Sequence, residues 1–412
     1  MKKFIKKKIR KLKPSATLVI NEKCKKLIAE GRKIYRFGFG QSPFPVPKKI
    51  VETLKNNAHR KNYLPIQGLS ELRESISKYL LKKTGTIYPK ENILITPGSK
   101  EAMLLMHVAF KGEIILPAPS WVSYEPQAII GSNKVHWLQT SRENNWFPTA
   151  KEVENKIKSI KKNKNIILIL NSPNNPSGTI CKNFKEIAAV AKKYKIIILS
   201  DEIYTDLTFN NKYESISQYY SEGTFVSSGL SKWCGAGGWR LGFFAVPKKL
   251  SNFLDSLKSL ASESYSTVNT PVQYAAVEAY TGNYNEYSFK VKKILNAVGT
   301  YVYENLKSNK ILINRPQGAF YLMPEFLNTK YKNSIKLCDA ILDETGVAML
   351  PASEFGFAPK KMLTRLSYTD FNGEEFYKNV NRSCTINDHI IEKYAPNVVK
   401  GVKKLSNWAQ KL

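Results

Sequence analysis

The 412-residue chain has few of the residues that form disulfides or bind metal ions. Its five cysteines are an odd number, stand far apart at positions 24, 181, 234, 338 and 384, and form no CxxC pair. Its four histidines are equally scattered. This pattern argues against a disulfide framework and a structural zinc site, and it is typical of a reducing compartment. We therefore expect a cytoplasmic protein without a metal site.

Long apolar runs are also missing. Hydrophobic residues make up 42% of the chain, which is usual for a globular protein, yet no run approaches the roughly 20 residues that cross a membrane. The basic segment 1–13 lacks the apolar core of about seven residues that a secretory signal requires. We expect this segment to form a basic helix or arm, in preference to a targeting signal, and we predict no membrane partner.

Acidic residues are scarce beside basic ones, 33 Asp and Glu against 64 Lys and Arg, so that the formal net charge is +31. An excess of this size raises the possibility of binding to nucleic acid. The lysines are spread along the whole chain, however, and asparagine is abundant too. We interpret the excess as compositional bias and expect no specific nucleic-acid partner, although nonspecific binding of polyanions at low salt is compatible with it.

Short β-branched runs alternate with helical stretches in the first two thirds of the chain. The expected strands are 93–96, 113–116, 166–170, 196–200, 224–227 and 243–246. The expected helices are 13–31, 47–59, 70–83, 100–110, 150–161, 184–194 and 248–261. Such alternation predicts a doubly wound, mainly parallel sheet, with functional loops at the carboxyl ends of its strands.

The alternation stops near Pro271. A helix to about residue 307 is followed by strand-like pieces at 311–314, 319–323, 347–350 and 364–367. We therefore predict an α/β protein with a large domain at 48–300 and a smaller α+β domain at 301–412. The segment 1–47 is assigned to an N-terminal arm and to part of the small domain.

The stretch 227–242 is rich in glycine and serine and carries Lys232 eight residues before Arg240. A desolvated lysine favours the neutral, nucleophilic amine, and a guanidinium fork suits a phosphate. A lysine that can form an imine beside a phosphate-binding arginine is what pyridoxal phosphate requires. The alternative is an ordinary surface loop that carries two of the many basic residues.

Polar residues follow several of the expected strands. They include the turn at 171–178, Asp201 with Tyr204, the segment 98–100 before a helix, and Trp121. Each has a purely structural explanation, such as a turn-forming proline, a strand-end cap or a core aromatic residue. Because the carboxyl ends of parallel strands share one edge of the sheet, their combination favours a common site.

This set of motifs resembles the class I and II aminotransferases, fold-type-I pyridoxal phosphate enzymes similar to aspartate aminotransferase, from residue 13 to residue 368. The resemblance implies pyridoxal 5′-phosphate as cofactor, an L-amino acid and a 2-oxo acid as substrates, and a ping-pong mechanism through pyridoxamine phosphate. It also implies a homodimer with shared active sites. The amino donor stays open among aspartate, aromatic and neutral amino acids.

The resemblance gives the residues around the cofactor ring distinct roles. Lys232 is expected to bind the cofactor covalently and later to move a proton. Asp201 is expected to face the ring nitrogen and keep it protonated, so that the ring accepts electrons. Tyr204 and Asn175 are expected to hydrogen-bond the phenolic oxygen, and Trp121 to stack on the ring.

The resemblance also implies how the phosphate and the substrate are held. The phosphate is assigned to backbone N–H groups and one guanidinium, those of Gly98, Ser99, Lys100 and Arg240. Tyr63 is expected to reach the phosphate of the neighbouring subunit. Arg365 is expected to clamp the substrate α-carboxylate, with Gly40, Asn175 and Trp121 beside it.

Two positions depart from the family pattern. Where many relatives carry a phosphate-binding serine this chain has Gly229, so that contact is lost or is made by Ser228 or Ser231. The arginine that reads a second substrate carboxylate in animal-type relatives has no match in 262–266, which contains Glu263. We therefore expect neutral or aromatic donors to compete well with aspartate. We expect 2-oxoglutarate to be an acceptor only if another cation, from the N-terminal or Lys100 region, faces the pocket.

Two alternatives stay open. A pyridoxal phosphate lyase or decarboxylase would share the fold, but an amino acid alone would not convert its cofactor to pyridoxamine phosphate. A catalytically idle binding or regulatory protein would be marked by loss of Lys232, Asp201 or Arg365, and all three are present.

Overall fold

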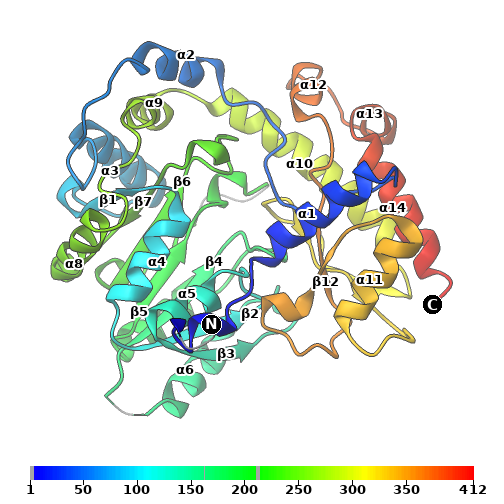
Figure 1. The fold of residues 1–412 in the computed structure, drawn as a ribbon, viewed down its shortest axis with the longest axis horizontal. Coiled ribbons are helices and arrows are strands. Elements are labelled where there is room, and N and C mark those ends of the chain that lie inside the picture. Colours follow the sequence, from blue (N-terminus) through cyan, green and yellow to red (C-terminus); the bar gives the residue numbers. More distant parts are fainter. Residues whose placement is uncertain (1–3, 162, 210–213) are drawn as a thin grey trace.

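A seven-stranded sheet forms the centre of the molecule in the computed structural model, which describes residues 4–161, 163–209 and 214–412 (Figure 1). The strands are β1 (Ile93–Thr96), β2 (Glu113–Ala118), β3 (Lys134–Gln139), β4 (Ile166–Asn171), β5 (Ile197–Asp201), β6 (Thr224–Gly229) and β7 (Gly242–Ala245). Their spatial order is β1-β7-β6-β5-β4-β2-β3. The pairs among β3, β2, β4, β5 and β6 are parallel. The predicted α/β fold with a mainly parallel sheet is confirmed.

One strand, β7, runs against its neighbours and pairs antiparallel with both β6 and β1. The reason lies in the connection between β6 and β7, residues 230–241, which contains only the 3-10 turn Gly237–Trp239. A parallel return usually requires a crossover helix, and this connection has none. The reversal keeps Lys232 at the edge of the sheet where β5 and β6 end.

Helices cover both faces of the sheet (Figure 1). They are α2 (Lys48–Asn57), α3 (Ser70–Thr84), α4 (Ser99–Ala109), α5 (Tyr124–Gly131), α6 (Ala150–Ser159), α7 (Phe184–Lys193), α8 (Ser251–Ser262) and α9 (Thr270–Thr281). Successive side chains of β4 enter two different cores. Ile167 and Ile169 join the cluster that includes α4 and α8, whereas Leu168 and Leu170 join the cluster of α6 and α7. Burial of each such side chain contributes about 1.5–3 kcal/mol, so the sheet is stabilised from both sides.

Strand β3 and helix α5 were not predicted. The β3 sequence, Lys-Val-His-Trp-Leu-Gln, lacks a continuous apolar run because β3 is the edge strand and is only partly buried. Helix α5 has eight residues and contains a proline, which weakens a helical pattern. The helix expected between 271 and 307 forms as two helices, α9 and α10, interrupted at Gly282.

The C-terminal part contains two small antiparallel sheets, β8 (Ile311–Leu312) with β10 (Glu325–Phe326), and β11 (Leu350–Pro351), β12 (Thr364–Ser367) and β9 (Tyr321–Leu322) in that order. Its helices are α10 (Asn285–Leu306), α11 (Ser334–Thr345), α12 (Gly373–Lys378), α13 (Asp388–Tyr394) and α14 (Pro396–Ala409). The proposed domain boundaries at 47 and 300 stay predictions, and α10 runs across the second of them.

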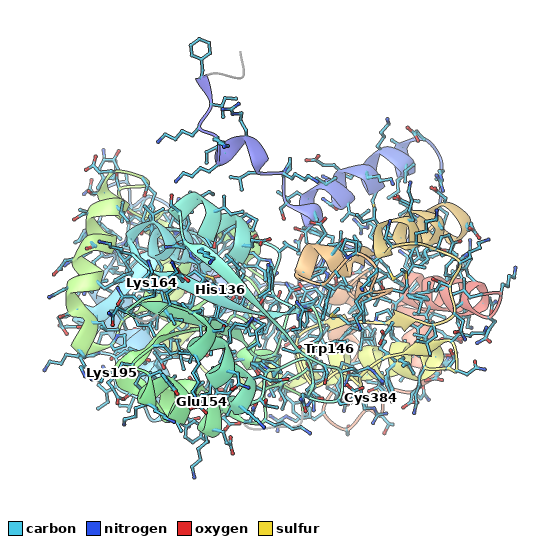
Figure 2. The ribbon with its side chains drawn as sticks, turned by 90° about the horizontal axis from the view of Figure 1, so that it is seen from below. His136, Trp146, Glu154, Lys164, Lys195 and Cys384 are labelled. Atoms are coloured by element: carbon cyan, nitrogen blue, oxygen red, sulfur yellow. The ribbon has the colours of Figure 1, made fainter. Side chains whose placement is uncertain are left out.

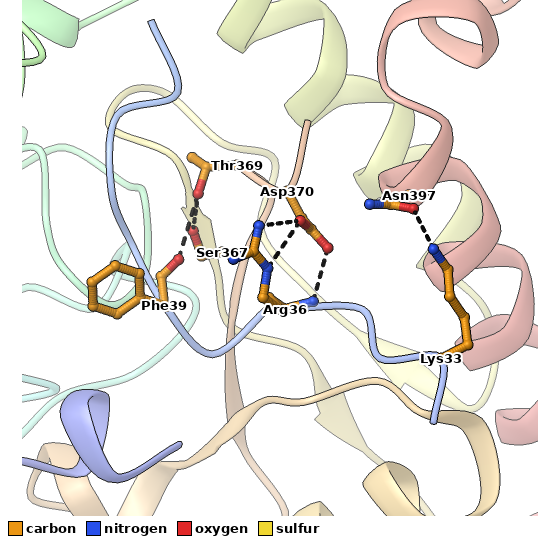
Figure 3. A network of polar contacts seen from close by, with 7 residues as sticks. All are labelled: Lys33, Arg36, Phe39, Ser367, Thr369, Asp370 and Asn397. Atoms are coloured by element: carbon orange, nitrogen blue, oxygen red, sulfur yellow. Dashed lines mark hydrogen bonds and ion pairs between the residues drawn. The ribbon is translucent and has the colours of Figure 1, made fainter. Parts of the chain in front are cut away.

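The N-terminal residues pack against this C-terminal part. Helix α1 (Ala16–Ala29) lies over it (Figure 1), and Tyr35 forms an isolated parallel bridge with Val347. In Figure 3 the guanidinium and the backbone N–H of Arg36 both meet the carboxylate of Asp370, the N–H at 2.9 Å. The chain is thereby anchored just before residues 38–41, which enter the cavity described below.

The basic segment before α1 stands away from the body (Figure 2). Its described part has one 3-10 turn, Ile9–Lys11, and Phe4 is 90% exposed. The Lys8 Nζ donates to the Ile130 carbonyl and to the Ser132 hydroxyl, both at 2.7 Å. Within the described ranges, no helix combines the length and apolar character of a membrane span.

Candidate active site

A cavity of about 400 Å³ lies where the carboxyl ends of β4 and β5 and the 230–241 loop meet the C-terminal part. This volume lies within the usual range for small-molecule sites. The predicted residues that line it are Gly40, Ser99, Lys100, Trp121, Asn175, Asp201, Tyr204, Lys232, Arg240 and Arg365. The chain thus brings together groups that lie more than 300 residues apart in sequence.

Asp201 ends β5 and is buried. Its Oδ2 accepts a 2.6 Å hydrogen bond from the Tyr124 hydroxyl, and its Oδ1 accepts one from the Ile203 N–H at 3.3 Å. Burial raises the pKa of the Asp201 carboxyl to about 6, and the Tyr124 hydrogen bond opposes this rise. A buried carboxylate gains most from a cationic partner. The protonated ring nitrogen of pyridoxal phosphate has that charge, so Asp201 fits the cofactor.

Lys232 lies in a partly buried loop, in which Leu230, Trp233 and Cys234 are core residues, and it lines the cavity. Its Nζ donates to the Gly40 carbonyl at 3.0 Å. Burial lowers the pKa of Lys232 to about 8, and the positive charges of Arg365 and Arg240 act in the same direction. A larger fraction of this amine is therefore neutral near pH 7 than for an exposed lysine. The interpretation as a surface loop does not hold.

Arg240 is held at the N-terminus of α4. Its Nη1 donates to the Gly237 carbonyl at 2.8 Å and its Nη2 to the Pro97 carbonyl at 3.1 Å. Gly98, which precedes α4, has φ +83° and does not itself line the cavity; a Cβ there would collide with the Arg240 guanidinium. The first N–H groups of a helix lack intrahelical acceptors and favour anions. This cradle of N–H groups and one guanidinium fits a phosphate.

The departure at Gly229 has a steric reason. A Cβ at Gly229 would lie 2.6 Å from the Leu241 carbonyl oxygen, because β6 and β7 pass closely there. Of the two neighbouring serines, Ser231 lines the cavity, whereas the Ser228 hydroxyl donates to the Glu202 carbonyl at 3.2 Å. Ser231 is therefore the hydroxyl available to a ligand in this region.

Arg365, on β12, is 1% exposed. Its Nη1 donates to the Asn175 Oδ1 at 3.2 Å and its Nη2 to the Gly38 carbonyl at 2.5 Å. Its Nε has no hydrogen-bond partner, and no Asp or Glu of the described residues is among the groups that shift its pKa. A buried guanidinium without an anion is costly. A bidentate carboxylate ligand would satisfy it.

The two predicted tyrosines, Tyr204 and Tyr63, lie in different environments. Tyr204 is buried, and its hydroxyl lies 2.8 Å from that of Tyr321. Tyr63 is 88% exposed and does not line the cavity of its own chain. The single chain therefore leaves Tyr63 on the surface, where only a partner molecule could use it.

Several lining or supporting residues were missed by sequence reasoning. They are Thr17, Phe39, Asn171, Tyr124 and Tyr321. Tyr124 is the first residue of α5 and stands three residues after Trp121, in a turn closed by the hydrogen bond from the Tyr124 N–H to the Trp121 carbonyl at 3.1 Å. Tyr321 belongs to a predicted strand, but which of its faces meets the cavity depends on packing between distant segments.

The comparison with known families decides among the possible uses of this cavity. The family model described as aminotransferase class I and II matches residues 32–378. The chain belongs to the class I and II aminotransferases. It is a pyridoxal-phosphate-dependent transaminase, in agreement with the fit of Asp201 and of the phosphate cradle to that cofactor.

Curated relatives of this aminotransferase support the assignment. It is 31% identical over 378 residues to the asparagine–oxo-acid transaminase of Streptococcus mutans, covering 88% of this chain and 93% of the relative. It is 31% identical over 384 residues to the aspartate aminotransferase of a Bacillus species, covering 89% and 95%. It is 32% identical over 385 residues to a probable aspartate/prephenate aminotransferase of Aquifex aeolicus, with the same coverage.

Solved structures show the same fold. The aspartate aminotransferase of Thermus thermophilus with maleate superposes with a TM-score of 0.85 at 23% identity, covering 98% of this chain and 99% of that one. The aspartate aminotransferase of Thermotoga maritima gives a TM-score of 0.82 at 25% identity, covering 98% and all of that chain. At 23% identity, the likeness to the Thermus enzyme shows the fold alone.

Proposed function

We propose that this aminotransferase transfers the amino group of an acidic amino acid of the aspartate type to a 2-oxo acid by a ping-pong mechanism. The observation that carries the proposal is the position of Lys100. It lines the same cavity as Arg365, and its Nζ lies 5.3 Å from the centre of the Trp121 ring. Arg365 suits the α-carboxylate, and Lys100 supplies a second cation for a side-chain carboxylate.

Lys100 has the properties expected of a residue that binds a substrate carboxylate. Burial lowers the pKa of Lys100, and the charge of Arg240 adds to this effect. No acidic side chain of the described residues is among the groups that shift its pKa. A bound carboxylate would place a negative charge beside Lys100. This charge would raise the pKa of Lys100 and so counteract both the burial and the charge of Arg240. The names of the curated relatives, which include aspartate aminotransferases, agree with such a substrate.

Glu263 does not oppose this proposal. It is exposed at the end of α8, where its Oε1 accepts a hydrogen bond from the Ser262 hydroxyl at 3.0 Å. Neither residue lines the cavity of this chain. The repulsion of acidic side chains that the sequence suggested therefore has no source within the single chain.

In the proposed reaction, each of these residues has a role toward the substrate or the cofactor. Bound pyridoxal phosphate supplies an electron-accepting ring that stabilises negative charge at the substrate Cα. Asp201 holds the proton on the ring nitrogen. Lys232 carries the cofactor between turnovers and moves the proton at Cα, because its lowered pKa suits a general base. Tyr204 and Asn175 donate to the phenolic oxygen.

The buried Arg365 supports the ping-pong order in this proposal. The amino acid and the 2-oxo acid both carry an α-carboxylate, and Arg365 is the fully buried guanidinium in the cavity. Two substrates that need the same clamp must bind in turn. Parallel lines in double-reciprocal plots, together with conversion of the cofactor to its amine form by amino acid alone, test this order. A lyase would not give that conversion.

The substrate proposal is tested with Lys100→Gln. We expect kcat/KM for aspartate to fall at least about tenfold, or 1.4 kcal/mol, while kcat/KM for phenylalanine and alanine changes little. Lys248→Gln is the matched control, because Lys248 is exposed, lies shortly before α8 and does not line the cavity. If wild-type enzyme shows no preference for aspartate over phenylalanine and alanine, or if all three donors lose equally in Lys100→Gln, the proposal is wrong.

We also propose a cytoplasmic homodimer in which Tyr63 completes the phosphate site of the partner. The exposure of Tyr63 and of nearby Ile66 supports a surface that a second copy covers. Mixing Tyr63→Ala with Lys232→Ala subunits should restore activity above that of either parent, because one hybrid site then has both intact residues. Additive activities without restoration would contradict shared sites.

A further inference from the structure

Behind Tyr204 lies a second buried tyrosine, Tyr321, at the start of β9. We infer that Tyr321 is a positioning residue for the transamination site: its hydroxyl donates to Tyr204, so that the hydroxyl hydrogen of Tyr204 is directed to the phenolic oxygen of the cofactor ring. The inference rests on the proposed function, because that function places Tyr204 against the ring.

The two phenols are held firmly in this arrangement. Their hydroxyl oxygens are 2.8 Å apart, and their rings meet edge to face at 5.7 Å with an interplanar angle of 83°. Phe320 packs edge-on against Tyr204 with ring centres 5.5 Å apart, and its ring lies tilted by 52° against that of Tyr321 with centres 4.8 Å apart. Because all three rings are buried, neither phenol ring can leave this arrangement without moving the core.

The number of hydroxyl hydrogens makes the direction of this bond important. Each phenol has one hydrogen, and the described residues give neither hydroxyl another hydrogen-bond partner. If Tyr204 donates to Tyr321, its hydrogen is used and its oxygen repels the anionic ring oxygen. If Tyr321 donates to Tyr204, the Tyr204 hydrogen is free for the cavity, and the donor is strengthened by the bond it accepts.

The charge of Arg365 favours Tyr321 as donor. The guanidinium carbon of Arg365 lies 4.9 Å from the centre of the Tyr321 ring. Burial raises the pKa of both phenols, and the Arg365 charge opposes the rise at both; at Tyr321 this charge is the largest influence after burial, whereas the pKa of Tyr204 is raised well above its usual value. Tyr321 is thus the more acidic hydroxyl of the pair, and the more acidic hydroxyl is the better donor.

Gly40 provides the space for this hydroxyl. A Cβ at Gly40 would collide with the Tyr321 hydroxyl oxygen, while the Gly40 carbonyl accepts the hydrogen bond from Lys232. Glycine at this position therefore does more than leave room for a substrate carboxylate. It allows Tyr321, Tyr204 and Lys232 to converge on one corner of the cavity.

The test uses Tyr321→Phe in the holoenzyme, because this variant keeps the ring against Arg365 and removes only the hydroxyl. The readout is the midpoint of the pH-dependent change in the visible absorption of the bound cofactor. A weaker Tyr204 donor stabilises the negative ring oxygen less after proton loss, so the proton is held more tightly. We expect the midpoint to rise by about half a pH unit or more.

Three further variants separate positioning from a structural effect. Tyr204→Phe should raise the midpoint more, and adding Tyr321→Phe to it should change nothing further, because Tyr321 acts through Tyr204. Tyr368→Phe is the matched control: Tyr368 is fully buried nearby, its hydroxyl faces the Ala319 carbonyl at 3.4 Å, and it does not line the cavity. It should leave the midpoint unchanged.

Kinetics give a second readout. Tyr321→Phe should lower kcat about threefold with an unchanged KM for aspartate, since the ring that packs on Arg365 remains. An unchanged midpoint in Tyr321→Phe, an equal rise in Tyr368→Phe, or a rise that persists in the Tyr204→Phe background would overturn the inference. A wild-type protein without a cofactor absorption band would instead refute the proposed function.

Discussion

The two walls of the cavity differ in the hydrogen-bond partners that they give to a buried charged group. On the wall built by the large sheet, both oxygens of Asp201 have donors in the chain itself, the Tyr124 hydroxyl and the Ile203 N–H. On the wall built by the C-terminal part, Arg365 has only neutral oxygens as partners, and its Nε has none. The carboxylate of the first wall is complete in its hydrogen bonds, and the guanidinium of the second wall lacks an anion.

Under the proposed function, this difference separates the cofactor, which stays bound, from the substrates, which bind and leave. A pre-paired carboxylate is oriented before the cofactor arrives and needs no reorganisation during turnover. An arginine whose best partner is missing binds each incoming carboxylate strongly and is returned to the same state when product leaves. Disturbing the first wall should therefore affect chemistry, and disturbing the second should affect substrate capture.

The largest expected effect is at Lys232, which connects the two walls through the Gly40 carbonyl. Lys232→Ala should lower transamination by about four orders of magnitude or more, since both covalent attachment and the proton carrier are lost. The exposed Lys248 replaced by alanine is the control. Borohydride reduction of the wild type followed by peptide mapping should place the cofactor on Lys232; a label on another lysine would refute the assignment.

Asp201→Ala tests the pre-paired wall. The variant should still bind the cofactor through the phosphate cradle, but its ring nitrogen would no longer be held protonated. We expect kcat and kcat/KM to fall together by about a thousandfold, or 4 kcal/mol, because the interaction matters most as charge develops in the transition state. Near-normal turnover would show that Asp201 does not face the ring.

Arg365→Lys tests the wall that awaits an anion. Lysine keeps the charge but cannot form the bidentate fork, and charged hydrogen bonds of this kind contribute about 1.5–3 kcal/mol. We expect kcat/KM to fall about ten- to a hundredfold for aspartate, phenylalanine and alanine alike. Loss for one donor only would place Arg365 at the side-chain end of the substrate.

Of these four substitutions, Tyr124→Phe should have the smallest effect on kcat. It tests directly whether the hydrogen bond to Asp201 distinguishes the two walls. It leaves the Asp201 carboxylate with one donor fewer, so kcat should fall about tenfold. The lost hydrogen bond had lowered the pKa of Asp201, so that pKa should rise and the acid limb of the pH–rate profile should move to higher pH. An unshifted limb with reduced kcat would indicate a packing defect instead.

Much of this description was determined by local sequence. The alternation of short apolar runs with helical stretches determined the layered sheet, because each strand buried on both faces must be continuously apolar. Asp201, Tyr204, Lys232 and Arg240 were identified because strand ends and glycine-rich turns have recognisable residues. These signals lie within a few residues of the group they mark.

Only the tertiary structure decided the rest. It decided that Lys100, and not Glu263, faces the cavity, that Tyr321 meets Tyr204 across 117 residues, and that Arg365 lies buried without an anion. The physical reason is that such contacts depend on how the C-terminal part packs on the sheet. The periodicity of a strand or helix predicts which of its residues share a face. It does not predict which distant segment that face will contact.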